Sequence, residues 1–324
     1  MIDHQMHWYP RSYFESILDR HGFPRTRRDG AGGYVFQASP REIEWAITPP
    51  YFDLDASLAQ AAADGVEAAV ISPNLVGDVT WYELGEARAT LDLLHDEYAR
   101  AQQRHGSRFI GLCMLPLQDT AAAIETLDDA IGRLGLRGVL MNVAPGGRPL
   151  VSEVTGPVFE RIEELGVPVF LHPANRSLVW DFSAPFGRLA ESGLGWMFDT
   201  SLAALSLITS GTLDRLPGLV VVHPHAGGTL PFVAGRLLAT AASTGAAGAL
   251  DRPLGEYFRE RFYVDSAMPT RGALELARDL YGERRILFGA DHPFHVRANV
   301  LARLAENVEP GLLEQVLANR VAGL

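Results

Sequence analysis

The stretch GPVFERIEELGVPVFLHP, residues 156–173, contains one helix–strand unit of the kind that decides the fold. Its first part, 156–166, has apolar residues at helical spacing and ends on a glycine, which suits a helix C-cap. Its second part, 167–173, is a short run of apolar and β-branched residues that a proline ends. The stretch therefore predicts a helix followed by a buried strand, with His172 near the carboxyl end of that strand.

Similar β-rich runs, each bounded by turn residues, recur along the chain with helical patterns between them. Strands that alternate with helices of this length indicate parallel β/α units. Eight such units predict an α/β protein with a closed (β/α)8 TIM barrel, and an open doubly wound sheet is the structural alternative. The eight predicted strands lie at 1–7, 67–73, 108–117, 137–143, 167–173, 218–224, 261–266 and 284–293.

One segment does not fit this alternation. The residues between Gly22 and Pro50 follow the first strand and include the run GGYVFQ. We expect this insertion, at about 22–50, to form a lid or flap over one end of the barrel. No repeat or linker marks a domain boundary, so the whole chain, 1–324, is predicted to be a single domain.

Composition limits the classes of partner. The 39 acidic residues outnumber the 28 basic residues, all of them arginines, which argues against non-specific binding of nucleic acid. The single cysteine, Cys113, lies in an apolar run and excludes an internal disulfide framework. No apolar run is long enough to span a bilayer, and the first residues do not resemble a secretory signal. We expect a cytoplasmic protein that binds neither nucleic acid nor membranes.

Polar residues end several predicted strands, at the rim where such barrels have their active sites. The first strand ends in His7, the fifth in His172, the sixth in the run HPHAGG and the eighth in Asp291. One histidine at a strand end is commonly a hydrogen-bonded structural residue, and an aspartate after Gly-Ala is often a turn or cap residue. Four such strands at one rim instead indicate two or three imidazoles and a carboxylate around a catalytic zinc or manganese ion.

These residues resemble the amidohydrolase-2 branch of the amidohydrolase superfamily, and within it the aminocarboxymuconate-semialdehyde decarboxylase group. The likeness runs nearly end to end. The family is known for barrel folds, a single divalent metal ion and C–C bond cleavage of carboxylated substrates, and some members are lactonases or hydratases. The resemblance lies in IDHQMHWYP (2–10), PVFLHP (168–173), HAGGTLPFVAGR (225–236), RFYVDSA (261–267), RILFGADHPF (285–294) and LANRVAGL (317–324).

The resemblance implies a role for each matching residue. His7, His172 and Asp291 match the metal ligands of the family, and Asp291 also belongs to the catalytic machinery. His225 matches the histidine of the His-x-Gly-Gly motif, which is the general acid/base. The implied cofactor is one divalent metal ion, Zn²⁺ or Mn²⁺.

The resemblance also implies substrate-binding residues. Arg236 matches an arginine that grips a substrate carboxylate across a dimer interface, so a homodimer is implied. Arg41 matches a second such arginine only loosely, and Phe294 is expected to line the pocket beside the metal. Trp8 and Trp180 suggest a flat substrate, although aromatic residues at strand ends also serve as plain packing.

Gln5 departs from the family pattern, because it stands where the motif has its first histidine. In an extended strand residues 5 and 7 face one side and His4 faces the other, so His4 replaces Gln5 only if a bulge shifts the register. We interpret His4 as a packed structural histidine. A glutamine oxygen can bind the metal directly, hold a water or leave the position vacant. We include Gln5 in the ligand set, where an oxygen ligand favours Mn²⁺ over Zn²⁺.

Four further polar residues near these motifs have open roles. His223 is interpreted as supporting the site or as structural, although it can project inward beside His225. His292 and His295 can donate protons or contact substrate, and exposure or helix capping is the favoured interpretation of each. Asp265 either orients a ligand histidine or stabilises a turn.

The function that these residues favour is metal-dependent, non-oxidative decarboxylation of an unsaturated or aromatic carboxylic acid. Metal-bound water and His225 would handle the protons. A hydrolase or hydratase that attacks a lactone, an amide or an activated double bond with the same site is the first alternative. A barrel that kept its pocket and binds a ligand without catalysis is the second.

Overall fold

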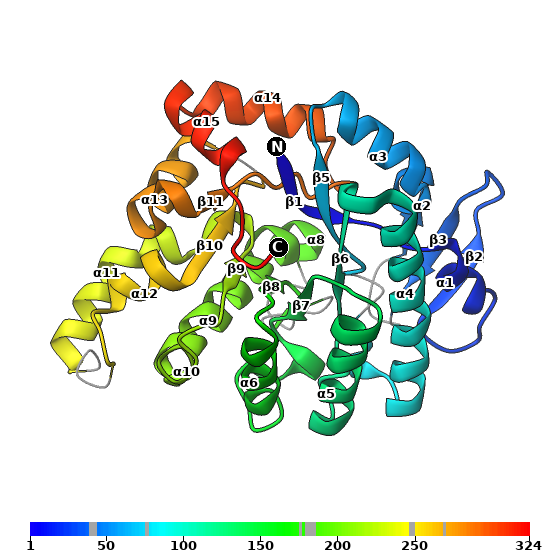
Figure 1. Cartoon of the computed structure of the whole chain (residues 1–324), viewed down its shortest axis with the longest axis horizontal. Helices are drawn as coiled ribbons and strands as arrows, with labels where there is room; N and C mark the ends of the chain where they lie inside the picture. Colours follow the sequence, from blue (N-terminus) through cyan, green and yellow to red (C-terminus); the bar gives the residue numbers. More distant parts are fainter. Residues whose placement is uncertain (39–43, 75–77, 175–176, 179–185, 246–249, 268–269) are drawn as a thin grey trace.

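The structure is a computed structural model that describes residues 1–38, 44–74, 78–174, 177–178, 186–245, 250–267 and 270–324. Its centre is a sheet of eight parallel strands whose spatial order is their order in the chain (Figure 1). All eight predicted strands are present. They are β1 (Ile2–His7), β5 (Ala68–Ser72), β6 (Phe109–Cys113), β7 (Gly138–Asn142), β8 (Val169–His172), β9 (Val221–His223), β10 (Phe262–Asp265) and β11 (Ile286–Leu287).

Backbone hydrogen bonds between β1 and the segment that follows β11 close the sheet into a barrel. The His7 amide donates to the His292 carbonyl oxygen at 2.7 Å, and the Asp291 amide donates to the Gln5 carbonyl oxygen at 2.8 Å. A parallel bridge also joins Met6 to His292. The prediction of a closed barrel is therefore confirmed, and the open-sheet alternative is wrong.

The helices form a layer around the strands (Figure 1). The stretch 156–173 forms helix α6 (Gly156–Leu165) and strand β8, as predicted. The longer helices of the outer layer are α3 (Leu54–Ala63), α4 (Leu84–His105), α5 (Thr120–Asp128), α9 (Trp196–Thr209), α11 (Leu230–Thr244), α12 (Leu254–Arg261), α13 (Arg271–Tyr281), α14 (Arg297–Asn307) and α15 (Pro310–Ala318).

Each strand is buried on both faces, which explains why the strands read as continuous apolar runs. In β8, Val169 and Leu171 pack in one cluster with Phe159 and Ile162 of α6, whereas Phe170 belongs to a second cluster. This second cluster lies inside the barrel, because it joins one side chain from each of six strands. These side chains are Val70, Leu112, Leu140, Phe170, Val222 and Leu287.

The segment between Gly22 and Pro50 contains a three-stranded antiparallel sheet of β2 (Arg25–Arg28), β3 (Tyr34–Gln37) and β4 (Trp45–Ile47). The sheet lies beside α1 (Arg11–Ser16) and α2 (Pro49–Phe52) at the edge of the barrel (Figure 1). Tyr34 and Phe36 are buried there in an aromatic cluster with Phe14. Within the described residues, no helix combines the length and the apolar character needed to cross a membrane.

Candidate metal centre and substrate cavity

Strand β1 contains a β-bulge at the position where the sequence departs from the family motif. Asp3 pairs with Ala69 and Met6 pairs with Ile71, so residues 4 and 5 together oppose one residue of β5. The Gln5 side chain reaches the rim of the barrel, where its Nε2 lies 3.3 Å from the imidazole of His225.

The bulge does not make His4 a metal ligand. The Nδ1 atom of His4 lies 3.1 Å from the carbonyl oxygen of Phe288, and His4 is not part of the ligand cluster described below. Burial lowers the pKa of His4 to about 4, which keeps its imidazole neutral. His4 therefore has the contacts of a packed structural histidine.

The three predicted ligands His7, His172 and Asp291 converge at one point. Each offers one ligand atom, and these atoms all lie within 4.8 Å of one another. The closest pair is His7 Nε2 and Asp291 Oδ1, at 3.0 Å. All three residues are buried, and they come from β1, β8 and the segment after β11, which are far apart in the sequence.

Hydrogen bonds orient both ligand imidazoles. His7 Nδ1 lies 3.0 Å from the Ser72 hydroxyl, and His172 Nδ1 donates to the Pro173 carbonyl oxygen at 2.9 Å. Both Nε2 atoms consequently face the cluster, as in most metal-binding histidines, whose other ring nitrogen bonds to oxygen. Asn74 Nδ2 lies 3.0 Å from His172 Nε2 and donates to the lone pair that would bind a metal ion, so the Asn74 amide has to turn away when the ion binds. Sequence reasoning missed Asn74, which follows β5 by two residues at the same rim.

The ionisation of the cluster suits a divalent cation. Burial, together with the neighbouring His7 and His225, lowers the pKa of His172 to about 3, so this imidazole is neutral. Burial alone would raise the pKa of Asp291, but its hydrogen bond to His7 and the nearby imidazoles bring that pKa below its ordinary value. Neutral imidazole and ionised carboxylate are the forms that bind metals.

Two observations show that the cluster fits a cation. The His7 imidazole and the Asp291 carboxylate face each other at 3.0 Å, an arrangement that a shared proton or metal ion satisfies. The Oε1 atom of Gln5 is buried and has no hydrogen-bond partner. Because an unpaired buried acceptor costs stability, a cation within reach of Oε1 would also satisfy the amide oxygen. The residues present therefore fit one divalent ion.

Close packing explains why a glycine, Gly289, stands two residues before Asp291. A Cβ atom on Gly289 would lie 2.9 Å from Cβ of Asp265 and 3.1 Å from Cβ of Gln5, so only glycine lets the backbone pass here. Asp291 itself has a φ of 55°, which strains a residue other than glycine. The tight passage and the strained turn aim the Asp291 carboxylate at the two imidazoles.

His225 lies directly after β9 in a left-handed turn, since His225 and Ala226 both have a φ of 55°. Its Nε2 lies 3.9 Å from Asp291 Oδ2, and its Nδ1 is buried without a hydrogen-bond partner. The turn needs the two following glycines, because a Cβ on Gly227 would lie 2.6 Å from the Tyr281 ring. Burial lowers the pKa of His225, so the imidazole is a weak base and its protonated form a strong acid.

Asp265 supports this turn through the backbone. Its Oδ1 accepts hydrogen bonds from the amides of His225, at 2.9 Å, and Ala267, at 3.0 Å. Burial raises the pKa of Asp265 to about 8. Of the two roles considered for Asp265, the contacts favour the turn role, because the carboxyl group holds the backbone of His225 and forms no hydrogen bond to a ligand imidazole among the described residues.

The other histidines near the motifs differ in position. His223 lies 3.1 Å from the Tyr281 hydroxyl and is structural. His292 contacts a serine hydroxyl outside the ligand cluster. His295 lines the cavity, and its Nε2 lies 3.7 Å from Asp291 Oδ2. Exposure or capping was the favoured interpretation of His295, and its place beside the cluster depends on the turn after β11, which the sequence does not reveal.

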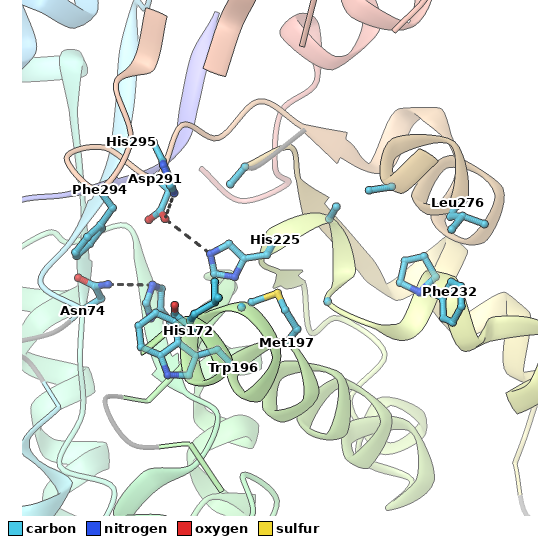
Figure 2. Close-up of a pocket in the computed structure, with 18 of the residues that line it drawn as sticks. Asn74, His172, Trp196, Met197, His225, Phe232, Leu276, Asp291, Phe294 and His295 are labelled. Carbon is cyan, nitrogen blue, oxygen red and sulfur yellow. Dashed lines mark hydrogen bonds and ion pairs between the residues drawn. The ribbon is translucent and has the colours of Figure 1, made fainter. Parts of the chain in front are cut away.

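A cavity of about 700 Å³ extends from the ligand cluster of His172 and Asp291. Figure 2 shows His172, His225 and Asp291 facing one another at one side of it, with Asn74 and Phe294 beside them. The Phe294 ring lies 5.6 Å from the His7 ring, between centroids. The indole of Trp45, from the inserted sheet, packs edge-to-face on Phe294 and also lines the cavity.

Two predicted substrate-binding residues, Trp8 and Arg236, are not among the described residues that line this cavity. Trp8 is buried in the outer core, where its indole donates to the Phe52 carbonyl oxygen at 3.0 Å, so its predicted role is wrong. The cause is strand alternation, since His7 points into the barrel and the next residue points out. Arg236 is exposed on α11. Arg41 and Trp180 lie outside the described residues.

The family model described as Amidohydrolase matches residues 2–319 of the chain. The chain belongs to this amidohydrolase family. A relative in Dictyostelium discoideum, a 2-amino-3-carboxymuconate-6-semialdehyde decarboxylase, is 31% identical over 264 residues, which cover 80% of this chain and 71% of the relative. A gamma-resorcylate decarboxylase of Rhizobium sp. is 28% identical over 86% of this chain and 87% of its own length.

Solved structures of other proteins share the barrel of this amidohydrolase. IDCase from Metarhizium anisopliae, in its apo form, superposes with a TM-score of 0.82 at 24% identity, over 98% of this chain and 94% of that chain. A dihydroxybenzoic acid decarboxylase from Polaromonas sp., solved with manganese and the inhibitor 2-nitroresorcinol, has a TM-score of 0.74 at 24% identity, over 82% and 84% of the two chains. These likenesses confirm the fold.

Proposed function

We propose that this amidohydrolase is a metal-dependent, non-oxidative decarboxylase of an aromatic or otherwise conjugated carboxylic acid. One observation carries the proposal: the imidazole of His225 stands next to the His7–His172–Asp291 cluster at the polar end of a cavity whose remaining lining is mostly apolar. A proton donor and a cation site thus share one water-poor space. The two relatives named above, both decarboxylases, support the same reaction class.

His7, His172 and Asp291 would hold the ion, with Oε1 of Gln5 as a fourth ligand. A divalent ion bound there supplies Lewis-acid polarisation of a substrate oxygen. We favour Mn²⁺ over Zn²⁺, because two of the four proposed ligand atoms are oxygens. The manganese in the solved Polaromonas decarboxylase is consistent with this choice.

His225 is the proposed proton donor. A proton from its imidazole would add to the substrate carbon that bears the carboxylate, which makes that carbon tetrahedral. The bond to the carboxylate then breaks, CO2 leaves, and the bonding electrons restore the conjugated system with the new hydrogen in place. Because burial lowers the pKa of His225, its protonated form gives up the proton readily. Asp265 holds the backbone of this residue in place.

The described cavity wall suits a planar ring but offers no cationic side chain that would pair with the substrate carboxylate beside the metal ion. Trp45 and Phe294 supply flat aromatic surface, and the described lining residues include no lysine or arginine. We infer that Arg236 of a second copy supplies the missing cation in a homodimer. Arg236 is exposed on α11 in a region with many exposed apolar side chains, which is typical of protein interfaces. These side chains are Phe186, Leu189, Leu194, Phe198, Leu202 and Phe232.

Release of CO2 from hydroxybenzoic acids by the Mn²⁺-loaded protein tests this function. We expect turnover of at least one ortho-hydroxylated acid, and a loss of about 10²–10⁴-fold in kcat for His225→Asn, the range typical of a general acid. His21→Asn, at an exposed histidine outside the cavity, is the matched control and keeps its activity. Hydrolysis of a lactone or amide without CO2 release, or full activity of His225→Asn, would overturn the proposal.

A further inference from the structure

We propose that the substrate carries an apolar substituent that extends away from its reacting carboxyl group. This inference deepens the proposed function, and it rests on that function only for the reacting end of the substrate. It concerns the part of the cavity bordered by Met197, Pro231, Phe232, Ala273 and Leu276, which we call the apolar limb.

The apolar limb and the ligand cluster border the same cavity. Asp291 and His172 line the same cavity as Phe232 and Leu276. Figure 2 shows His225 and Met197 between the ligand cluster on one side and Phe232 and Leu276 on the other. A molecule whose carboxyl group lies at the cluster can therefore continue into the limb without leaving the cavity.

The two ends of the cavity differ in chemistry. The polar side chains Asn74, His172, His225, Asp291 and His295 gather at the cluster end. The limb is bordered by side chains of α9, α11 and α13 that offer no hydrogen-bonding group, and the described lining holds no lysine or arginine. The limb opens to solvent at Phe232 and Leu276, which are exposed. Where its walls cover a substituent, a charged group gains no partner, whereas an alkyl or aryl group gains from burial.

The size of the cavity also favours a substrate with an apolar substituent. Its volume of about 700 Å³ corresponds to roughly twenty water molecules at the volume that each occupies in the liquid. It lies within the range of pockets that bind drug-sized ligands. A single-ring acid without a side chain would fill the cluster end and leave the limb to water, against apolar walls. A tail that displaces this water explains why the limb exists.

Affinity for a homologous series tests the inference without depending on turnover. The probes are 2-hydroxybenzoic acids alkylated para to the carboxyl group, from the unsubstituted to the hexyl acid, and binding to the Mn²⁺-loaded protein is measured by calorimetry. We expect Kd to fall about fourfold per methylene until the limb is filled, which is the fold-change that corresponds to about 0.8 kcal/mol per buried CH2.

One pair of variants assigns the effect to the limb. Ala273 lines the limb in the first turn of α13, so Ala273→Trp should block it. We expect this variant to bind the hexyl acid no better than the methyl acid, while its Kd for the methyl acid stays within about twofold of wild type. Glu275→Trp places the same side chain at an exposed position of the same helix and should keep the full dependence on chain length.

The outcomes separate this inference from the proposed function. If affinity rises with chain length and CO2 is released, both stand. If affinity rises and no acid loses CO2, the result supports the proposal of an apolar substituent and contradicts the proposed decarboxylation. If affinity does not change along the series, or if Ala273→Trp keeps the dependence, the inference is overturned whatever the activity. A flat series together with a changed oligomeric state of Ala273→Trp would assign the limb to contact between copies of the chain.

Discussion

At Gln5 a single residue sets the character of the metal site. Its amide oxygen is buried and unpaired, and its amide nitrogen lies 3.3 Å from Nε2 of His225. One side chain can thus contribute an oxygen to the metal and a contact to the acid/base. The amide is neutral, so a divalent ion bound with Asp291 as its one carboxylate would keep a net positive charge, which suits a substrate that arrives as an anion.

We predict that Gln5→Glu binds Mn²⁺ at least about tenfold more tightly than wild type, because a charged oxygen replaces a neutral one, and that Gln5→Ala binds it about tenfold more weakly. Titration of the metal-free proteins with Mn²⁺, followed by electron paramagnetic resonance, measures both affinities. Gln60→Ala, at an exposed position of α3, is the control. Equal affinities for all four proteins would show that Gln5 is not a ligand.

At the scale of elements, the bulged strand β1 is held by a buried ion pair. Asp3 accepts a hydrogen bond from Arg297 Nε at 2.8 Å and another from the Ala290 amide at 2.9 Å. Both charged side chains are almost fully buried. Asp3 therefore ties β1 to the start of α14 and to the segment that carries Asp291. The position of two metal ligands depends on this joint between the two ends of the chain.

We predict that Asp3→Ala lowers the free energy of unfolding by about 3–5 kcal/mol, because the variant removes the close partner of the buried Arg297 guanidinium. Only the longer contact of Arg297 with Asp64, at 3.7 Å, remains. Urea unfolding followed by circular dichroism gives the value. Glu125→Ala, which breaks the exposed pair with Arg88, should cost less than about 1 kcal/mol and serves as the comparison. A loss of similar size in both variants would contradict a structural role for the buried pair.

The elements could be predicted from the sequence far better than their register. Each strand is a local run of apolar residues, and the helices end at recognisable glycines such as Gly166, so the eight β/α units are visible without the structure. The bulge at residues 4 and 5 depends on pairing with β5, more than sixty residues away, and no local pattern reveals it.

Part of the candidate site could also be predicted from the sequence. His7 and His172 end strands, and His225 and Asp291 follow strand ends at the same rim, so their convergence follows from the barrel. Asn74 was missed because its role depends on where the imidazole of His172 lies in space. For His295 and Trp8, the turn after β11 and strand alternation decide which side chain faces the cavity, and residue type alone does not reveal it.

At the scale of the whole molecule, the proposed site is complete only when a second copy of the chain supplies Arg236. The described lining of the cavity contains no lysine or arginine, and Arg236 is exposed on α11 and is not among the described residues that line this chain's own cavity. A two-fold dimer would place the same face of each copy against the other, because the interface of such a dimer is made by one patch from both chains.

Mixing two inactive variants tests this arrangement. Arg236→Ala and His225→Asn should each be inactive, and co-refolded or subunit-exchanged mixtures should recover about one quarter of wild-type activity. Half of the dimers would then be mixed, and each mixed dimer would have one intact site. Recovery is expected only if Arg236 acts on the partner's cavity. A mixture that stays inactive, although mass measurement shows mixed dimers, would mean that Arg236 acts within its own chain or not at all.

The most direct test of the whole account is the metal content of the protein, measured by elemental mass spectrometry after purification without chelators or a metal-affinity column. His172→Ala is measured beside the wild type, because His172 is one of the three clustered ligands. The account predicts about one manganese or zinc ion per wild-type chain and a loss of that ion in the variant. A wild-type protein that holds no metal, even after incubation with Mn²⁺ and Zn²⁺, would contradict it.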